Sequence, residues 1–362
     1  MSQSQNSHNA ATTLVPNVTI GLDLGDRMSR TYEVDASGAC LREGAVPTTL
    51  AGITHYFAKR ERCRVVLEVG THSPWVSRLL EQLGHEAIVA NPSAMFAGRG
   101  RRRRRNDRLD ARFLGRQGRA DVELLYPLTH RSADAQQDLE YLRARDQLVA
   151  TRTKLINHVR GAVKSSGARL SRCSSEAFAK RAAGEVPPAL APALTPLLEV
   201  IADLTRRIGQ AEAQLAAVTA ERHPVALRLQ QPAGVGPLTA LAFVLLIEDP
   251  TRFHKSRDVG AYFGLVPRLD ESGDSAPQLR ISKAGDEFGR RLLVSAAHYI
   301  LGPFGPDCDL RRYGAAIAQR GGTNAKKRAV IAVARKLAVL LHRLWVSEAP
   351  YDPDYQRKRR AA

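Results

Sequence analysis

The sequence lacks long apolar runs and has little cysteine. No stretch of the 362 residues approaches the roughly 18 uninterrupted apolar residues that a membrane span requires. Met1 to Thr13 is polar and has no apolar core, so we do not expect a signal peptide. The cysteines form no CxxC pair, which argues against zinc and disulfide frameworks; they are Cys40, Cys63, Cys173 and Cys308. These absences favour a reduced, cytoplasmic setting without membrane contact.

Acidic and aromatic residues are also few. Asp and Glu number 36 against 54 Lys and Arg, which gives a net charge of +18, and aromatic residues make up 6%. An excess of this size favours a polyanion over a small neutral substrate. A membrane surface is a poorer partner, because the basic residues do not flank a long apolar helix. With 44% hydrophobic residues, the chain is long enough for two domains with their own cores.

Residues 17–128 show the pattern of an α/β domain. Val18, Ile20 and Leu22 alternate as in a strand, and Thr31–Val34 is a candidate hairpin partner. The elements expected next are a helix over Leu50–Lys59, a strand over Val65–Glu68, a helix over Trp75–Leu83, a strand over Glu86–Ala90 and a helix over Asp107–Gln117. This order of strands and helices predicts a layered α/β fold. We expect residues 1–16 to be a disordered tail.

Residues 129–222 are expected to form a helical, coiled-coil segment. One apolar stripe consists of Leu139, Leu142, Val149, Ile156, Val159 and Val163. A second alternates spacings of four and three, the period of a coiled coil, and consists of Leu197, Ile201, Leu204, Ile208, Ala211, Leu215 and Val218. A break that ends at Pro187-Pro188 separates them, which indicates a helical hairpin. Pairing with a partner chain and an internal two-helix bundle both suit this pattern.

Residues 223–346 are expected to form a second, mostly helical unit. It opens with Pro232–Pro237 and an apolar helix through Leu246, and it closes with a helix over Asn324–Trp345. Gly234-Val235-Gly236 resembles a helix-hairpin-helix turn, whose N–H groups can bind phosphate, although such GxG turns are common. Residues 347–362 form a polar, basic tail.

Four acidic residues in two places indicate a metal site. Asp23 and Glu68 each end an apolar run, whereas Asp107 and Asp110 are three residues apart and share one helical face. Carboxylates at such positions can hold magnesium for phosphoryl transfer. Each acid also has a structural explanation, as a turn residue or as a favourable charge at a helix start. The four together, beside an arginine run, favour the metal site.

The arginine run indicates a nucleic-acid partner. Between Arg99 and Arg119 there are ten arginines against two aspartates. A charge run is usually a solvated face, but this density and the fork of the guanidinium favour phosphate. Contacts of this kind give affinity and not sequence specificity. The residues assigned to nucleic acid here are Arg101, Arg102, Arg103, Arg104, Arg105 and Arg108.

A loop in the C-terminal half offers a nucleophile. Ser272 lies next to Gly273, and basic residues that could hold a phosphate surround it: Arg268, Arg280, Lys283, Arg290 and Arg291. Ser275 and Ser282 are equal competitors on chemistry alone. A polar surface turn explains the same residues.

Taken together, these residues resemble the DEDD transposases of bacterial insertion sequences, the "one-ten" family of bridge-RNA-guided recombinases. The likeness runs from about Val18 to Trp345. It implies a RuvC-like domain of RNase H fold with Asp23, Glu68, Asp107 and Asp110 as its four acids. It also implies a C-terminal transposase domain, in which Gly264-Leu265-Val266-Pro267-Arg268 and Ser282-Lys283-Ala284-Gly285 are close matches. The family's nucleophilic serine falls on Ser272.

The resemblance implies RNA-guided insertion and excision of a mobile element. Its implied parts are a divalent metal such as Mg²⁺, a structured guide RNA, double-stranded target and donor DNA, and a transient phosphoserine link to DNA. It further implies a dimer to tetramer with a composite site, and a bacterial, nucleoid-associated location. Asn106 before Asp107, Leu24 after Asp23 and Val69 after Glu68 depart from the usual family pattern, which puts local geometry and RNA preference in doubt.

Three alternatives remain open. A RuvC-like junction nuclease that acts through metal-activated water needs the four acids but not Ser272. An actin-like or sugar-kinase-like ATPase suits Ile20–Gly25, but the arginine run and the lack of a clear second glycine-rich phosphate loop argue against it. A non-catalytic RNA-binding protein explains the basic charge alone.

Overall fold

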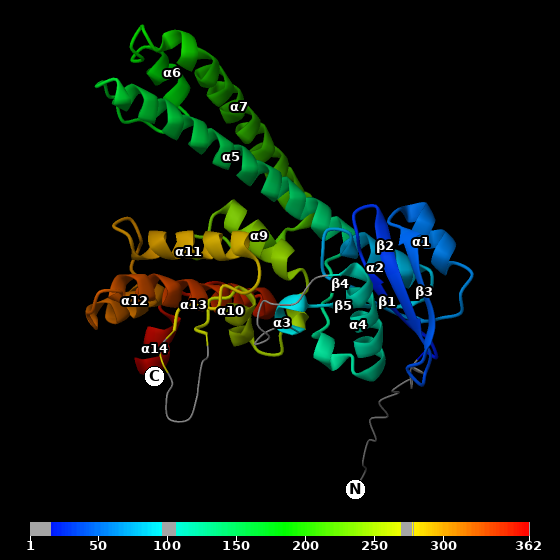
Figure 1. Cartoon of the computed structure of the whole chain (residues 1–362). Helices are drawn as coiled ribbons and strands as arrows, with labels where there is room; N and C mark the ends of the chain where they lie inside the picture. The colour runs from blue at the N-terminus through cyan, green and yellow to red at the C-terminus, as the bar shows by residue number, and fades with distance from the viewer. Residues whose placement is uncertain (1–15, 96–105, 269–276, 278, 362) are drawn as a thin grey trace. The chain divides into compact units, whose positions relative to one another are not determined.

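The structure is a computed structural model that describes residues 16–95, 106–268, 277 and 279–361. The chain divides into two compact units, residues 1–131 and 132–362. The first contains the predicted α/β domain. The second contains both the predicted helical segment and the predicted C-terminal domain (Figure 1). No helix within the described ranges is long and apolar enough to cross a membrane.

A five-stranded mixed sheet forms the centre of the first unit. Its strands are β1 (Thr19–Asp23), β2 (Met28–Val34), β3 (Cys40–Pro47), β4 (Arg64–Glu68) and β5 (Glu86–Ala90), in the spatial order β3-β2-β1-β4-β5. The β1–β2 and β2–β3 pairs are antiparallel, whereas β1–β4 and β4–β5 are parallel. The predicted strands and the predicted hairpin are therefore confirmed. Strand β3 was not predicted, because this edge strand is mostly exposed and has no apolar alternation.

Helices cover both faces of this sheet, because successive strand residues point to opposite sides. Ile20 and Leu22 pack in one core with α1 (Leu50–Phe57) and α2 (Ser73–Gln82). Val66 packs on the other face with Leu114 of α4 (Asp107–Ala120). The expected helices are thus present, α1 ending at Phe57 and not at Lys59. Two short helical segments complete the unit, namely α3 (Pro92–Met95) and η1 (Glu123–Leu125).

A long helical hairpin opens the second unit. It consists of α5 (Ala133–Ser165) and α7 (Ala191–Arg222), with α6 (Phe178–Ala183) at the tip (Figure 1). The predicted hairpin is confirmed. Its tip has a core of its own, in which Ile201 is fully buried against α5 and α6 residues such as Val159 and Phe178. The second stripe is therefore buried largely within one chain, and pairing with a partner chain is not required to cover it.

The rest of the second unit is helical, and its helix α9 (Pro237–Ile247) is buried almost all round. The other helices are α8 (Val225–Arg228), α10 (Val259–Tyr262), α11 (Glu287–Leu301), α12 (Asp309–Gln319), α13 (Ala325–Ser347) and α14 (Tyr355–Ala361), with the 3₁₀ turns η2 (Pro250–Arg252) and η3 (Ser256–Asp258). The predicted helices through Leu246 and over Asn324–Trp345 are confirmed. Leu139, Leu142 and Leu215 of the hairpin base belong to this core.

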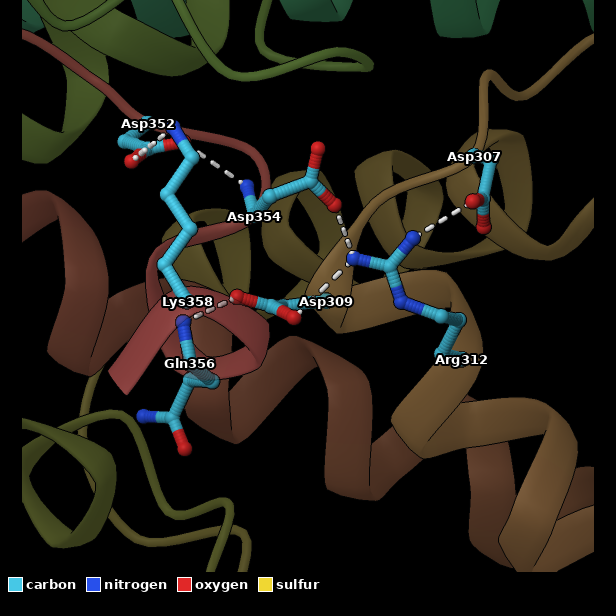
Figure 2. Close-up of polar contacts among 7 residues, drawn as sticks. All are labelled: Asp307, Asp309, Arg312, Asp352, Asp354, Gln356 and Lys358. Atoms are coloured by element: carbon cyan, nitrogen blue, oxygen red, sulfur yellow. Dashed lines mark hydrogen bonds and ion pairs between the residues drawn. The ribbon is translucent and has the colours of Figure 1, made fainter. Parts of the chain in front are cut away.

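The basic C-terminal tail is folded back onto α12 and is partly helical. Arg312 forms ion pairs with Asp307, Asp309 and Asp354 (Figure 2). The Asp309 N–H donates to the Pro353 carbonyl at 2.8 Å, and the Asp309 carboxylate accepts from the backbone N–H of Gln356 at 2.6 Å. Hydrogen bonds from Arg312 to Asp309, and then to Asp354, raise the pKa of that guanidinium further. Arg312 is thus the centre of the tail's attachment.

Candidate active site

Two of the four predicted acids lie side by side at the carboxyl edge of the sheet. The parallel register of β1 and β4 pairs Leu22 with Leu67. Asp23 and Glu68 follow these residues directly as the last residues of their strands. Both side chains are half-buried. Neighbouring parallel strands therefore present one carboxylate each at the same edge.

The other two acids lie in the first turn of α4. Asn106 caps this helix, because its side chain accepts a hydrogen bond from the Arg108 N–H at 3.1 Å. Asp107 is exposed and Asp110 is half-buried. Their negative charge is also favourable at a helix N-terminus, so helix stability alone accounts for part of this arrangement.

Gly21 brings α4 against the sheet. A Cβ atom at Gly21 would lie 2.0 Å from the Ala111 carbonyl oxygen, so only glycine permits this approach. Arg64, the first residue of β4, donates from Nη1 to the Gly118 carbonyl at 3.0 Å. The C-terminal half of α4 therefore lies toward the amino end of β4. Its first turn, with Asp107 and Asp110, lies toward the carboxyl edge that carries Asp23 and Glu68.

The donor set fits a hard divalent cation, which prefers carboxylate oxygens. In the part of the chain that the structure describes, no three His, Cys, Asp or Glu side chains are grouped closely enough to hold a metal ion. The backbone thus brings the four acids to one edge, and their side chains would have to turn inward to share a cation. Their role as ligands stays a prediction.

His72 and His130, which the sequence analysis did not single out, lie near this edge. Trp75 donates from Nε1 to His72 Nδ1 at 3.2 Å, so a neutral His72 carries its proton on Nε2, which lies 3.9 Å from Asp26 Oδ1. The Ser73 hydroxyl lies 2.9 Å from His130 Nε2. Burial, with the charges of Arg78 and Arg131, lowers the pKa of His130. The sequence does offer a signal for His72 and Asp26, because these residues follow soon after Glu68 and Asp23, the acidic residues that end β4 and β1.

The predicted serine nucleophile lies outside the described residues, as do Ser275 and Arg101 to Arg105. The residues on both sides of the serine loop are described and form a neck. Pro267 and Ile281 make an antiparallel bridge, the Arg268 N–H donates to the Arg280 carbonyl at 3.0 Å, and the Ser282 N–H donates to the Val266 carbonyl at 2.8 Å. The chain that carries Ser272 thus begins and ends at two segments that are hydrogen-bonded to each other.

A glycine fixes the base of this neck. Gly264 has φ +64°, and a Cβ there would lie 2.1 Å from the Ala284 carbonyl oxygen. Arg290 donates from Nη1 to the carbonyls of Phe263 and Ala284, at 3.1 and 3.2 Å. This arginine of α11 therefore holds both sides of the neck together, in addition to any contact with nucleic acid.

The predicted basic residues differ in their surroundings. Arg268, Arg280 and Lys283 are exposed at the neck. Arg291 pairs with Asp146 of α5 at 2.6 Å, and Arg108 pairs with Glu43 of β3. Nucleic-acid binding by Arg108 and Arg291 would compete with these ion pairs.

Comparison with known proteins identifies the family. A DEDD profile of the IS110 type, described as "Transposase", matches residues 20–166, and a profile described as "Transposase IS116/IS110/IS902 family" matches residues 226–307. The transposase for insertion sequence element IS1111A of Coxiella burnetii is 34% identical over 260 residues, which are 68% of each chain. The chain belongs to the IS110 family of transposases. This transposase is therefore an enzyme of DNA recombination, and its family implies a divalent metal requirement.

Two further relatives extend the likeness. The transposase for insertion sequence element IS1328 of Yersinia enterocolitica is 30% identical over 289 residues, 78% of the transposase described here and 84% of that protein. A probable family 20 transposase of Pseudomonas aeruginosa is 28% identical over 344 residues, which cover 92% and 98% of the two chains. The DEDD match spans all four acids of the transposase, and its family implies a RuvC-like fold for the mixed sheet.

Proposed function

We propose that the transposase is an RNA-guided DNA recombinase that inserts and excises a mobile element through a covalent serine–DNA intermediate. In this proposal Asp23, Glu68, Asp107 and Asp110 are metal ligands, and Ser272 is the nucleophile. The observation that carries it is that the ends of two parallel strands, β1 and β4, lie at the same edge of the sheet as the first turn of α4. Gly21 permits the close approach of α4 to β1. The partners are structured non-coding RNA and double-stranded target and donor DNA.

The proposed reaction conserves the number of phosphodiester bonds. Ser272 Oγ attacks the phosphorus of a DNA phosphodiester, and the bond from phosphorus to one sugar oxygen breaks. The serine loses its proton, and the leaving sugar oxygen gains one. A sugar hydroxyl of another strand then attacks the phosphoserine, forms the new phosphodiester and returns the serine hydroxyl. A bound divalent cation would neutralise charge that develops on the phosphate. Arg268, Arg280 and Lys283 would hold the phosphate oxygens.

We further propose that the site is composite, with the acids of one subunit and the serine of another, in a tetramer. The α5–α7 hairpin would supply subunit contacts through side chains that its internal packing leaves exposed, such as Val200, which is 47% exposed. The competing function is a RuvC-like nuclease that resolves junctions by activated water, without a covalent step.

The test uses the full transposase, end-labelled junction DNA and RNA transcribed from the DNA that flanks the gene. The variant Ser272→Ala should form no adduct that survives denaturation and no recombinant, whereas Ser275→Ala and Ser282→Ala serve as matched controls. Wild-type recombination by Ser272→Ala would refute the serine mechanism. Cleavage that continues without an adduct would identify the nuclease.

The acids are tested in the same assay. Asp23→Asn, Glu68→Gln and Asp107→Asn should each lose cleavage while they keep binding to DNA and RNA, because the phosphate-binding arginines remain. Full activity in all three variants would exclude the metal site. Element ends and a structured non-coding segment beside the gene would support RNA guidance, and equal recombination without any RNA would contradict it.

A further inference from the structure

A broad groove in the second unit joins the neck of the serine loop to α12 and α13. Its volume is about 1130 Å³, above the roughly 300–1,000 Å³ of pockets for small ligands. Its walls come from η3, the two neck segments, α12 and α13. A space of this size suits a segment of a polymer better than a single small molecule.

The rim of the groove is strongly basic. It consists of exposed Arg and Lys side chains: Arg257, Arg280, Lys283, Arg320, Lys327, Arg328, Arg335 and Lys336. None of the described residues that line the groove is acidic. Lys336 Nζ lies 3.9 Å from the centre of the Tyr313 ring, so this aromatic ring is part of the same charged wall. Such a field favours a polyanion.

The floor of the groove is apolar. It is formed by Leu265, Leu279, Ile281, Ile317, Ile331 and Val339. Double-stranded DNA presents its phosphates outward and would leave such a floor uncovered. An unpaired strand can place its bases and sugars on apolar side chains while its phosphates meet the rim. The combination of rim and floor therefore favours single-stranded nucleic acid over a duplex.

The groove extends to the neck of the serine loop. Pro267, Arg280 and Lys283 line it, and they belong to the two neck segments between which Ser272 stands in the sequence. A nucleic-acid strand bound at the neck would therefore also contact the groove. This continuity selects DNA over RNA as the occupant, because the phosphodiester that the serine attacks is in DNA.

We propose that this groove binds an unpaired segment of the DNA strand that is cleaved and exchanged, with its phosphates on the basic rim and its bases on the apolar floor. The assignment of that strand rests on the proposed serine mechanism. The binding preference of the groove does not, and it can be measured alone.

The test measures binding of the full transposase, without RNA, to fluorescent single-stranded DNA of about 20 nucleotides, the matching duplex and the matching RNA. The double variant Arg320→Gln, Lys327→Gln should bind single-stranded DNA about tenfold more weakly. Its slope of log affinity against log salt should fall by about 1.4, or roughly 0.7 for each phosphate that is no longer neutralised. The control Lys164→Gln, Arg169→Gln removes the same charge from exposed positions around the end of α5 and should bind as the wild type does.

A variant in the apolar floor of the groove separates the contribution of charge to binding from the contribution of contacts with the bases. Ile317→Thr keeps the branched, uncharged side chain but makes it smaller and polar, so it should weaken single-stranded binding about threefold and leave the salt slope and duplex affinity unchanged. Equal losses in the rim variant and the control would overturn the proposal, as would equal losses for single strand and duplex in Ile317→Thr. A larger loss for RNA than for DNA would make the groove an RNA site. Thermal melting checks that each variant is folded.

The test of the groove and the test of the serine mechanism can fail independently of each other. If Ser272→Ala still recombines while Arg320→Gln, Lys327→Gln loses single-stranded binding, the groove stands and the serine mechanism fails. If Ser272→Ala loses its adduct while the groove variants bind normally, the groove is refuted and the serine mechanism stands.

Discussion

At the scale of single residues, Gly21 sets the distance between α4 and β1. A methyl group there would meet the Ala111 carbonyl and the Gly115 backbone nitrogen, at 2.0 and 2.4 Å. Backbone atoms cannot move aside as a flexible side chain can. The placement of Asp110 therefore depends on a residue that carries no functional group.

The variant Gly21→Ala should destabilise the first unit by about 3 kcal/mol, the upper part of the range for overpacking. Hydrogen exchange should accelerate in peptides from β1 and α4. Gly161→Ala is the matched control, because the space around Gly161 on α5 is open, and alanine there should be neutral or slightly stabilising. Unchanged exchange in Gly21→Ala would contradict the close packing.

His130 should make the stability of the first unit depend on pH. Its pKa is lowered by burial and by Arg78 and Arg131, so the unfolded chain takes up a proton near pH 6.5 before the folded chain does. Stability therefore falls as the pH drops through that range. The melting temperature of His130→Gln should fall less between pH 7.5 and 5.5, because the amide can still reach Ser73 but does not titrate. An identical fall in variant and wild type would exclude this role.

At the scale of elements, two separate hydrophobic cores stabilise the α5–α7 hairpin. Ile156, Val159, Val163 and Ile201 close a core at the tip, whereas Leu139, Leu142 and Leu215 join the core of the C-terminal helices. The tip can therefore loosen while the base stays folded.

Ile201→Ala should cost about 3 kcal/mol, within the usual range for truncation of a buried isoleucine. The loss should appear as faster hydrogen exchange in α6 and in the tip halves of α5 and α7. Glu199→Ala is the control, because Glu199 lies two residues earlier on the same helix and is exposed. Equal effects of the two changes would contradict the burial of Ile201 in a core at the tip.

The elements that the sequence predicted are those with a buried apolar pattern. The alternation at Ile20 and Leu22 and the stripes of α5, α7 and α13 each mark a face that must be covered. Strand β3 has no such face, since it lies at the sheet edge. The same applies to the site: strand-end acids are visible as interruptions of apolar runs, whereas His130 is brought to Ser73 only by the tertiary fold. The preference for Ser272 over Ser275 came from the family resemblance alone.

At the scale of the whole molecule, the C-terminal tail depends on Arg312. Arg312→Met should release the tail, since carboxylates of Asp307, Asp309 and Asp354 all lose their shared partner. Hydrogen exchange should rise across residues 349–361. Arg228→Gln removes one exposed ion pair, to Glu348, and should have little effect. Equal protection of the tail in wild type and Arg312→Met would show that the hydrogen bonds of Asp309 to Pro353 and Gln356 hold it without Arg312.

Mixed assemblies test the composite site. Asp23→Asn and Ser272→Ala are each expected to be inactive alone. A mixture of the two should recover part of the activity, because some sites combine intact acids from one subunit with an intact serine from another. No recovery, in mixtures shown to exchange subunits, would assign both halves to one chain.

The two separate cores of the hairpin also make its length adjustable. Between the tip and the base, α5 and α7 lie side by side, and the apolar stripe of α7 repeats every seven residues, or about two helical turns. Inserting one such repeat into both helices at the same level would preserve every contact at either end. Natural variants and engineered enzymes could thus acquire longer or shorter arms while the rest of the fold stays unaltered.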